Sequence, residues 1–486
     1  MARPYQVTSH ESFSHDSLDS LGYDWERVAD PTIRPRYPLK VYLPQTTEDI
    51  VAVVREAREL GQKLIVRSKG HSSNDLVLQD RGVVLCTQKL DSVLELDEQA
   101  MTVRVQSGVV LAQLDTYLGA RGYGLPVIGD HNDITAGGFA SVGGIGPASL
   151  RHGLFVDNVT QLEYVTWEGE VVSCGRDQNS GRFLQVLTGL GQHGVIATLT
   201  LQIIRVDKWG HILENDRTLY RRLDDFVRDS GAFLNDPGDT VLGRGFWLDF
   251  GRGVKVGQMS LYKDTPQTTS NSVRNRLFYT YLHAIGSWAG RAPRRVEPML
   301  KLLGVAGMIW VPRRSSIKNV ETFSDRVLDS TTGDPTRMLI ALVPSEQYPA
   351  LLRELYSLCQ EYRKRYKCFT FISFYIKSIR SEYLTNGGPH RYYCELILLP
   401  GIRPEGMTPE VLEQFVSRMD DLCIRYGAYR YMHTKTVKDL ERRRLIDPNA
   451  TYSSPLAALE NPAPWNGEGG DSHRGARPKA QGVGPG

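Results

Sequence analysis

The stretch KLIVRSKGHSSND, residues 63–75, places a histidine directly after a short apolar run. The run Leu-Ile-Val is typical of a buried strand, whereas the glycine and small hydroxyl residues around His71 are typical of a tight turn. A buried strand has no structural need for a histidine at its end. We therefore interpret the turn that holds His71 as a functional element.

Helix and strand patterns alternate around this stretch. Residues 46–61 predict a helix, because Thr46 suits an N-cap, apolar residues follow at helical spacing, and Gly61 suits a C-cap. A second helix is expected over residues 110–122, and a β-hairpin around Glu168 and Gly169. Short apolar and β-branched runs predict strands at 63–68, 82–87, 92–97, 101–108 and 194–206. This part of the chain is thus expected to be an α+β domain.

The other parts of the chain differ in character, and 486 residues are too many for one core. Residues 1–36 are expected to lead into the first domain, residues 37–207. Residues 208–407 predict antiparallel strands with helices between them, which is typical of a second domain. Residues 408–460 form a helix-rich segment. Residues 461–486 are rich in glycine and proline and poor in aliphatic side chains, so a disordered tail is expected there.

The composition excludes several classes of function. The formal net charge is +3 and no basic stripe with interleaved aromatic residues appears outside residues 273–314, so nucleic acid is not an expected partner. The six cysteines are scattered without a CxxC pair and the histidines lack ligand spacing, which argues against a disulfide framework or a metal site. No apolar run reaches the roughly 18 residues of a membrane-spanning helix, and the first residues do not resemble a signal peptide. We expect a soluble, cytoplasmic protein, whose oligomeric state the sequence leaves open.

Two further glycine clusters accompany the turn with His71. The sequence GLGQHG, residues 189–194, satisfies the dinucleotide pattern GxGxxG, but a helix pattern precedes it and a strand pattern follows it. A dinucleotide fingerprint needs the reverse order, so a Rossmann fold is rejected. The other cluster is TAGGFASVGGIG, residues 135–146. Either these are three unrelated tight turns, or their backbone N–H groups together cradle a phosphorylated cofactor.

Taken in order, the three stretches resemble the flavin-binding domain of the vanillyl-alcohol oxidase family, also called the p-cresol methylhydroxylase type. Within the family, the flavin domain is most similar to that of the cytokinin dehydrogenases. The resemblance covers residues 38–206 and the C-terminal segment from MHTKTV to about residue 454. It implies a two-subdomain FAD-binding domain, a substrate domain with an antiparallel sheet covered by helices, and a C-terminal segment that returns to the FAD domain.

The resemblance also implies how FAD is bound. In relatives with Gly-His-Ser in this turn the histidine is bonded to the flavin 8α-methyl, and His71 is the matching residue; the alternative is a turn histidine beside non-covalent FAD. A second, cysteinyl bond is excluded, because no cysteine lies between Cys86 and Cys174. The further residues expected at the cofactor are Ser68, Lys69, Gly70, Ser72, Asp130, Thr135, Gly138, Ser141, Ile145 and Ile196.

Asp130 is the expected catalytic base, since relatives carry an aspartate seven positions before Gly137. A carboxylate beside an apolar ring is partly desolvated, which suits a proton acceptor. Asp133 competes for this role, and both residues are also common in loops. Two further catalytic candidates by resemblance are His433 and Lys435. Other polar candidates near the pocket are His131, His152, Tyr375, Lys377, His390, Tyr392 and Tyr393, with Ser107 or Gly108 beside the flavin edge that meets oxygen.

These features predict an FAD-dependent oxidoreductase. The expected substrate is a small organic molecule whose C–H next to nitrogen or oxygen delivers hydride to flavin N5, with oxygen or another acceptor taking the electrons and a role in secondary metabolism. Two alternatives stay open. The substrate class is a sugar, alcohol or lactone instead, or the chain binds a flavin or another ligand without turnover.

Overall fold

The computed structural model describes most of the chain, with gaps. The described residues are 6–7, 20–24, 35–72, 76–131, 133–270, 272–289, 299, 302–303, 306–307, 310–322, 339–369, 371–385, 388–398 and 406–431. The candidate residues His433 and Lys435 and the expected tail lie outside them. Helices and strands are mixed throughout, which confirms the expected α+β class.

A small parallel sheet leads into the turn that holds His71. Its strand order is β1-β2-β4-β3, and every neighbouring pair is parallel. The strands are β1 (Gln6–Val7), β2 (Lys40–Tyr42), β3 (Leu64–Arg67) and β4 (Val83–Cys86). Because β3 and β4 are adjacent and parallel, the segments that leave their carboxyl ends lie side by side. Ser68 and Thr87 accordingly share a hydrogen bond between their hydroxyls, 2.8 Å long.

Helix α3 (Thr47–Glu59) joins this sheet to a second one. A capping box closes its first turn: Thr46 Oγ1 accepts the Asp49 N–H and the Asp49 carboxylate accepts the Thr46 N–H, both at 3.1 Å. Its buried face, with Ile50 and Val54, shares one apolar cluster with residues of β4 and of the second sheet. The helix predicted from Thr46 and Gly61 is confirmed.

The second sheet is antiparallel, in the order β5-β6-β10-β8-β9. It contains β5 (Val93–Asp97), β6 (Thr102–Gln106), β8 (Val159–Val165), β9 (Val171–Gly175) and β10 (Val195–Gln202). Strands β8 and β9 form the predicted hairpin around Gly169, which has φ +79°. Around this sheet lie α4 (Leu111–Gly119), α5 (Ala136–Val142), α6 (Ser149–His152), α7 (Ser180–Val186) and the strand pair β7 (Tyr123–Gly124) and β11 (Ile204–Arg205).

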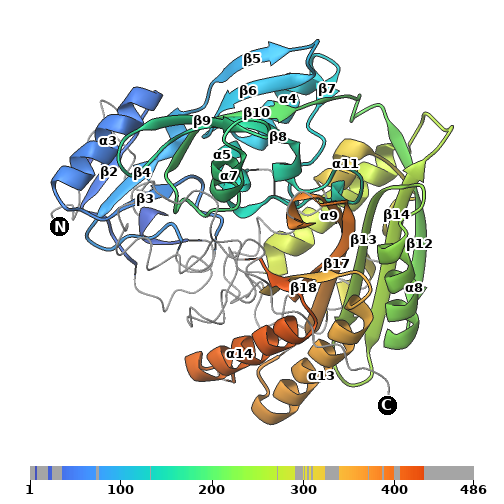
Figure 1. Cartoon of the computed structure of the whole chain (residues 1–486). Helices are drawn as coiled ribbons and strands as arrows, with labels where there is room; N and C mark the ends of the chain where they lie inside the picture. Colours follow the sequence, from blue (N-terminus) through green and yellow to red (C-terminus); the bar gives the residue numbers. More distant parts are fainter. Residues whose placement is uncertain are drawn as a thin grey trace, which may run out of the picture.

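The third sheet is large and wholly antiparallel, in the order β15-β12-β14-β13-β17-β18-β16-β19. Figure 1 labels β12, β13, β14, β17 and β18 of this sheet. Its strands are β12 (Ile212–Tyr220), β13 (Thr240–Asp249), β14 (Lys255–Asp264), β15 (Arg314–Ser316), β16 (Leu339–Pro344), β17 (Ile372–Ser381), β18 (Arg391–Leu398) and β19 (Tyr429–Arg430). Its helices are α8 (Leu223–Asn235), α9 (Ser272–Ala289), α11 (Ile317–Glu321), α13 (Tyr348–Tyr366) and α14 (Pro409–Arg425). None of the helices in the described ranges is at once long and apolar enough to cross a bilayer.

Short 3₁₀ helices complete the described elements. They are η1 (Ser20–Gly22), η2 (Thr87–Lys89), η3 (Phe155–Asn158) and η5 (Tyr383–Thr385). Helix η5 lies beside η3, as shown by the Asp157 carboxylate of η3, which accepts the N–H of Tyr383 of η5 at 2.9 Å. This contact ties the end of β17 to the loop before β8.

The large sheet has two differently covered faces. Trp247 and Phe374 point to one face and share a core with α8, α13 and α14, which lie together on that side (Figure 1). Their chain neighbours Phe246 and Tyr375 point to the other face, because side chains alternate along a strand. Tyr375 belongs to the same apolar cluster as Phe139 of α5 and Leu199 of β10. The second face of the large sheet therefore packs against the first part of the chain, around the second sheet and helix α5.

The second glycine cluster differs from the expected glycine turn. Residues 136–142 form helix α5, with Thr135 as N-cap accepting the Gly138 N–H on its side-chain oxygen at 3.2 Å. Glycine at position 137 allows the helix to approach β6, because a Cβ there would lie 2.6 Å from the Ser107 Cβ. The prediction of a turn was wrong because glycine's low helix propensity was outweighed by this cap and by close packing.

A buried group of four charges joins the first part of the chain to the large sheet. Lys208 Nζ lies 3.0 Å from Asp115 Oδ1 of α4 and 3.1 Å from Glu321 Oε2 of α11, and Lys318 Nζ lies 2.5 Å from Asp115 Oδ2. Burial alone would raise the pKa of Asp115, but the two lysines bring it below its ordinary value. Among the described residues these four charges form ion pairs with one another, so loss of one leaves a buried ion with fewer opposite charges.

We predict that Asp115→Asn lowers the free energy of unfolding by about 3–5 kcal/mol, because it leaves Lys208 and Lys318 with one carboxylate. Urea denaturation followed by circular dichroism measures this. The matched control is Glu361→Gln, which removes a half-exposed ion pair with Arg418 (2.7 Å) and should change the same quantity by less than about 1 kcal/mol. Equal effects of the two substitutions would contradict a bridging role of the buried group.

Candidate functional site

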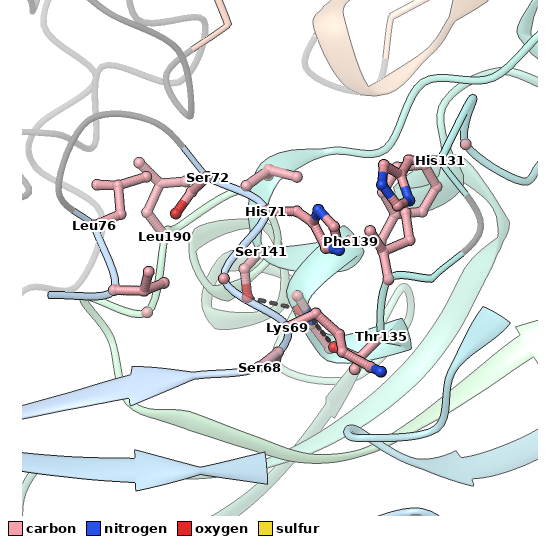
Figure 2. A pocket seen from close by; sticks show the side chains of 18 of the residues that line it. Ser68, Lys69, His71, Ser72, Leu76, His131, Thr135, Phe139, Ser141 and Leu190 are labelled. Atoms are coloured by element: carbon pink, nitrogen blue, oxygen red, sulfur yellow. Dashed lines mark hydrogen bonds between the residues drawn. The ribbon is translucent and has the colours of Figure 1, made fainter. Parts of the chain in front are cut away.

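One cavity of about 260 Å³ lies where the first part of the chain meets the large sheet. Its wall is built from the turn after β3, the loop after residue 128, helix α5, the segment before β10, and strands β16, β17 and β18. Figure 2 shows the side chains of the first four of these segments, among them His71, His131 and Ser141. The candidate residues that line it are Ser68, Lys69, Gly70, His71, Ser72, Asp130, Thr135, Gly138, Ser141, Ile145 and Ile196. His433 and Lys435 lie outside the described residues, and His152 and His390 are not among the lining residues.

The turn after β3 is held in shape by the buried side chain of Arg67. Its guanidinium donates to the carbonyl oxygens of Tyr23 (2.8 Å) and Val77 (3.4 Å). Gly70 has φ +75°, and a Cβ there would lie 2.4 Å from Arg67 Nη2. Glycine is required at this position both by the backbone conformation and by the space that the guanidinium occupies.

Helix α5 presents its first turn to the cavity. Thr135 Oγ1 and Ser68 Oγ flank Gly138, since a Cβ at this glycine would lie 3.0 Å from the first and 3.5 Å from the second. Ser141, one turn later, donates from its hydroxyl to the Gly137 carbonyl at 2.8 Å (Figure 2). The small residues leave room for a group to approach this part of the backbone closely.

Two hydroxyls in the cavity wall have no hydrogen-bond partner. Ser72 Oγ and Ser107 Oγ are both buried and unpaired in the described structure, and Ser107 is only 1% exposed. Buried polar atoms in native proteins are nearly always paired, so these two hydroxyls are available to bind a polar group or a water that enters the cavity. Both residues come from segments that the sequence already singled out.

The rings of His71 and His131 lie against each other at the cavity, with centroids 4.0 Å apart and an angle of 51° between the planes (Figure 2). They come from separate segments, the turn after β3 and the loop after residue 128. Lys69, two residues before His71, forms a half-exposed ion pair with Asp133 at 2.9 Å. Asp133, the competitor for the role of base, is thus engaged with a lysine at the rim and does not line the cavity.

Asp130, in the loop after residue 128, directly contacts strand β17 of the large sheet at the cavity. Its Oδ2 lies 2.5 Å from Lys377 Nζ, and its Oδ1 accepts the Tyr375 hydroxyl at 3.3 Å. Lys377 Nζ also lies 2.7 Å from Glu395 Oε2. Tyr375 is held in place by Phe246, whose ring stacks on it at 4.5 Å with only 4° between the planes.

The electrostatics of this group follow from burial and pairing. Burial alone would lower the pKa of Lys377, but Asp130 and Glu395 outweigh it and raise the pKa, so the lysine is charged. Burial raises the pKa of Glu395, and Lys377 offsets only part of this. Burial, with the charge of Asp130 next, raises the pKa of Tyr375, so its phenol is a proton donor at neutral pH.

Sequence reasoning named Tyr375 and Lys377 without choosing between them and their neighbours, and it missed Glu395 and Tyr431. Lys377 directly follows the apolar run Phe374–Ile376, and Glu395 stands between Cys394 and Leu396. A charged residue next to such apolar residues is a usable sequence signal. Tyr431 carried no such signal. Its hydroxyl accepts the Gly144 N–H at 2.9 Å, a contact between residues 287 positions apart.

The arrangement has two chemically distinct sides. One side offers glycine-rich backbone and hydroxyl groups, which suit phosphate and ring carbonyl oxygens. The other offers a carboxylate with an oriented phenol and ammonium, which suits proton transfer. Within the described residues, no three His, Cys, Asp or Glu side chains are grouped in a way that could hold a metal ion.

Comparisons with known proteins agree with this division. Residues 38–175 match the family described as FAD binding domain. The chain is 33% identical to a D-arabinono-1,4-lactone oxidase of Eremothecium gossypii, over 34% of this chain and 32% of that protein. It is 30% identical to an L-gulonolactone oxidase of Bos taurus (34% and 38%) and 27% identical to cytokinin dehydrogenase 3 of Arabidopsis thaliana (48% and 45%). The matches thus span about a third to a half of the length of these relatives.

We predict that Gly70→Ala lowers the free energy of unfolding by about 1–3 kcal/mol, because the methyl group meets the Arg67 guanidinium in a left-handed backbone conformation. The control is Gly122→Ala, at φ +80° with no atom within 4 Å of its Cβ, which carries the backbone strain alone. Urea denaturation of both variants separates the two effects. Equal losses would show that the guanidinium does not restrict the turn.

Proposed function

We propose that this chain, whose residues 38–175 match the family described as FAD binding domain, is an FAD-dependent oxidoreductase of a small organic substrate. The observation that carries the proposal is a single cavity lined both by three glycine-containing segments and by the Asp130 carboxylate. We assign residues 37–207 to FAD binding and residues 208–407 to the substrate.

The cavity fits FAD by its own chemistry. The orphaned hydroxyls of Ser72 and Ser107 and the approachable backbone at Gly138 are what a phosphorylated, carbonyl-bearing cofactor needs. The residues that would hold it are Ser68, Lys69, Gly70, His71, Ser72, Thr135, Gly138, Ser141, Ile145 and Ile196. Bound FAD supplies a two-electron acceptor at N5 for a hydride from a carbon next to nitrogen or oxygen.

Asp130 is the proposed proton acceptor. Its carboxylate lines the cavity, and Tyr375 and Lys377 fix both of its oxygens, so a substrate N–H or O–H meets an oriented base. Apolar side chains of the large sheet, Ile340 and Ile397, line the same side and limit access of water. Oxygen or another acceptor then takes the electrons.

The substrate class rests on analogy. Relatives named as lactone oxidases support a sugar-derived lactone or alcohol, and those named as cytokinin dehydrogenases support a C–H next to nitrogen. A carboxylate base serves either class, because both give up a proton from a heteroatom. The alternative is a flavin-binding protein without turnover. It gives no reason for a carboxylate, Asp130, that is oriented at the cavity by Tyr375 and Lys377.

We predict a covalent FAD at His71, whose ring lies in the cavity wall. The mass of the denatured protein should exceed the sequence mass by that of FAD, and His71→Ala should abolish this gain while the native protein still binds FAD. Ser72→Ala is the matched control and should keep the added mass. An unmodified wild-type mass from a yellow protein would contradict the bond and leave FAD binding intact.

We predict that a panel of lactones, sugars, alcohols and secondary amines contains a substrate that bleaches the flavin absorbance in the absence of oxygen. Asp130→Asn should slow the bleaching, per bound FAD, by about 10²–10⁴-fold, because the proton acceptor is lost. Stopped-flow absorbance measures both. A wild-type protein that holds FAD but is bleached by no member of the panel would favour the non-catalytic alternative.

A further inference from the structure

A buried lysine between two carboxylates is an unusual partner for a catalytic base. Lys377 is 2% exposed and Glu395 3%, whereas Asp130, at 12%, is the member of the group most open to the cavity. Lys377 and Glu395 are register partners on the adjacent strands β17 and β18. The lysine is thus fixed to the sheet by its neighbour, and Asp130 is the member contributed from a loop.

A lysine bound to Asp130 alone would work against catalysis. An ammonium 2.5 Å from a carboxylate in a poorly hydrated site favours the ionised carboxylate strongly, and a base so stabilised takes up a proton reluctantly. Glu395 changes this balance, because the same ammonium serves a second carboxylate at 2.7 Å. The negative charge of Glu395 also makes proton uptake nearby more favourable.

The geometry therefore points to two residues, Lys377 and Glu395, whose opposite charges act on the Asp130 carboxylate in opposite directions. We propose that Lys377 is the positioning residue that fixes the Asp130 carboxylate against the sheet, and that Glu395 compensates part of the positive charge of Lys377. This inference rests on the proposed function, in which Asp130 accepts the substrate proton. It concerns residues whose role neither the family motifs nor the relatives' names specify.

Other charged and titratable groups lie around Asp130. Tyr375 donates to Oδ1, and Arg244 of β13 is buried, donates to the Val320 carbonyl and interacts electrostatically with Asp130 and Tyr375. The groups that line the same cavity are His71, His131, Lys69 and Tyr431. All of them stay in place in the substitutions below, so only the opposed charges of Lys377 and Glu395 change.

The two parts predict shifts of opposite sign. In Lys377→Met the cation is lost, and the pH midpoint at which the remaining carboxylates become protonated should rise by about 1–3 units. In Glu395→Gln one negative charge is lost, and the midpoint of the carboxylate that remains beside Lys377 should fall. The pH dependence of the carboxylic acid C=O band in infrared spectra of the purified, FAD-loaded protein reports this directly. Asp130→Asn identifies which band belongs to Asp130.

Two matched variants separate charge from structure. Lys377→Arg keeps the cation and should restore the wild-type midpoint to within about one pH unit, which a packing defect would not do. Lys263→Met removes a lysine of the same sheet that pairs with Asp239 at 2.8 Å away from the cavity, and it should leave the band unchanged. If Lys377→Met does not fold, Glu395→Gln and Lys377→Arg carry the test.

Turnover gives the second readout. With a substrate found by flavin bleaching, the bleaching rate is measured against pH in both variants. The pH midpoint of its acid limb should follow the infrared midpoint, and so should be higher in Lys377→Met and lower in Glu395→Gln than in the wild type. Shifts of the same sign, or none, would overturn the inference. If no substrate bleaches the flavin, the proposed function fails, and the infrared titration still decides whether the opposed pair exists.

Discussion

The contact between Asp130 and Lys377 is the interaction on which the site depends. It joins a loop of the FAD-type part of the chain to the middle of the large sheet, at 2.5 Å and almost fully buried. Desolvating one of these ions without the other would be costly, so the two parts of the chain are held in one relative placement wherever both are charged. The cavity exists because that placement leaves space between them.

The large sheet supports this contact through the alternation of its side chains. Helices α8, α13 and α14 cover the face of the sheet that carries Trp247 and Phe374. The opposite face, which carries Phe246 and Tyr375, contributes to the cavity wall. Tyr375 and Lys377 are two positions apart on β17 and therefore emerge on the same face. Glu395 reaches the same place from β18 by register, without any relation in sequence.

The sequence was sufficient for what depends on neighbouring residues. Thr46 and Gly61 delimit a helix, and the apolar run before His71 forms a strand that ends where the glycine turn begins. The cavity residues of the three glycine-containing motifs were expected from the resemblance of these motifs, taken together, to a flavin-binding domain. Glu395 carried a local signal, but its pairing with Lys377 depends on strand register. Tyr431 was missed because its contact joins distant segments, which no local pattern encodes.

The hydrogen bond from the Gly144 N–H to the Tyr431 hydroxyl has a consequence for how the protein is made. It links segments 287 positions apart, so this part of the cavity wall closes only after the last strand of the large sheet has been synthesised and has docked. Contacts of such long sequence separation form late and slowly. A nascent chain therefore exposes the glycine-rich segment around Gly144 until Tyr431 has been synthesised and has docked.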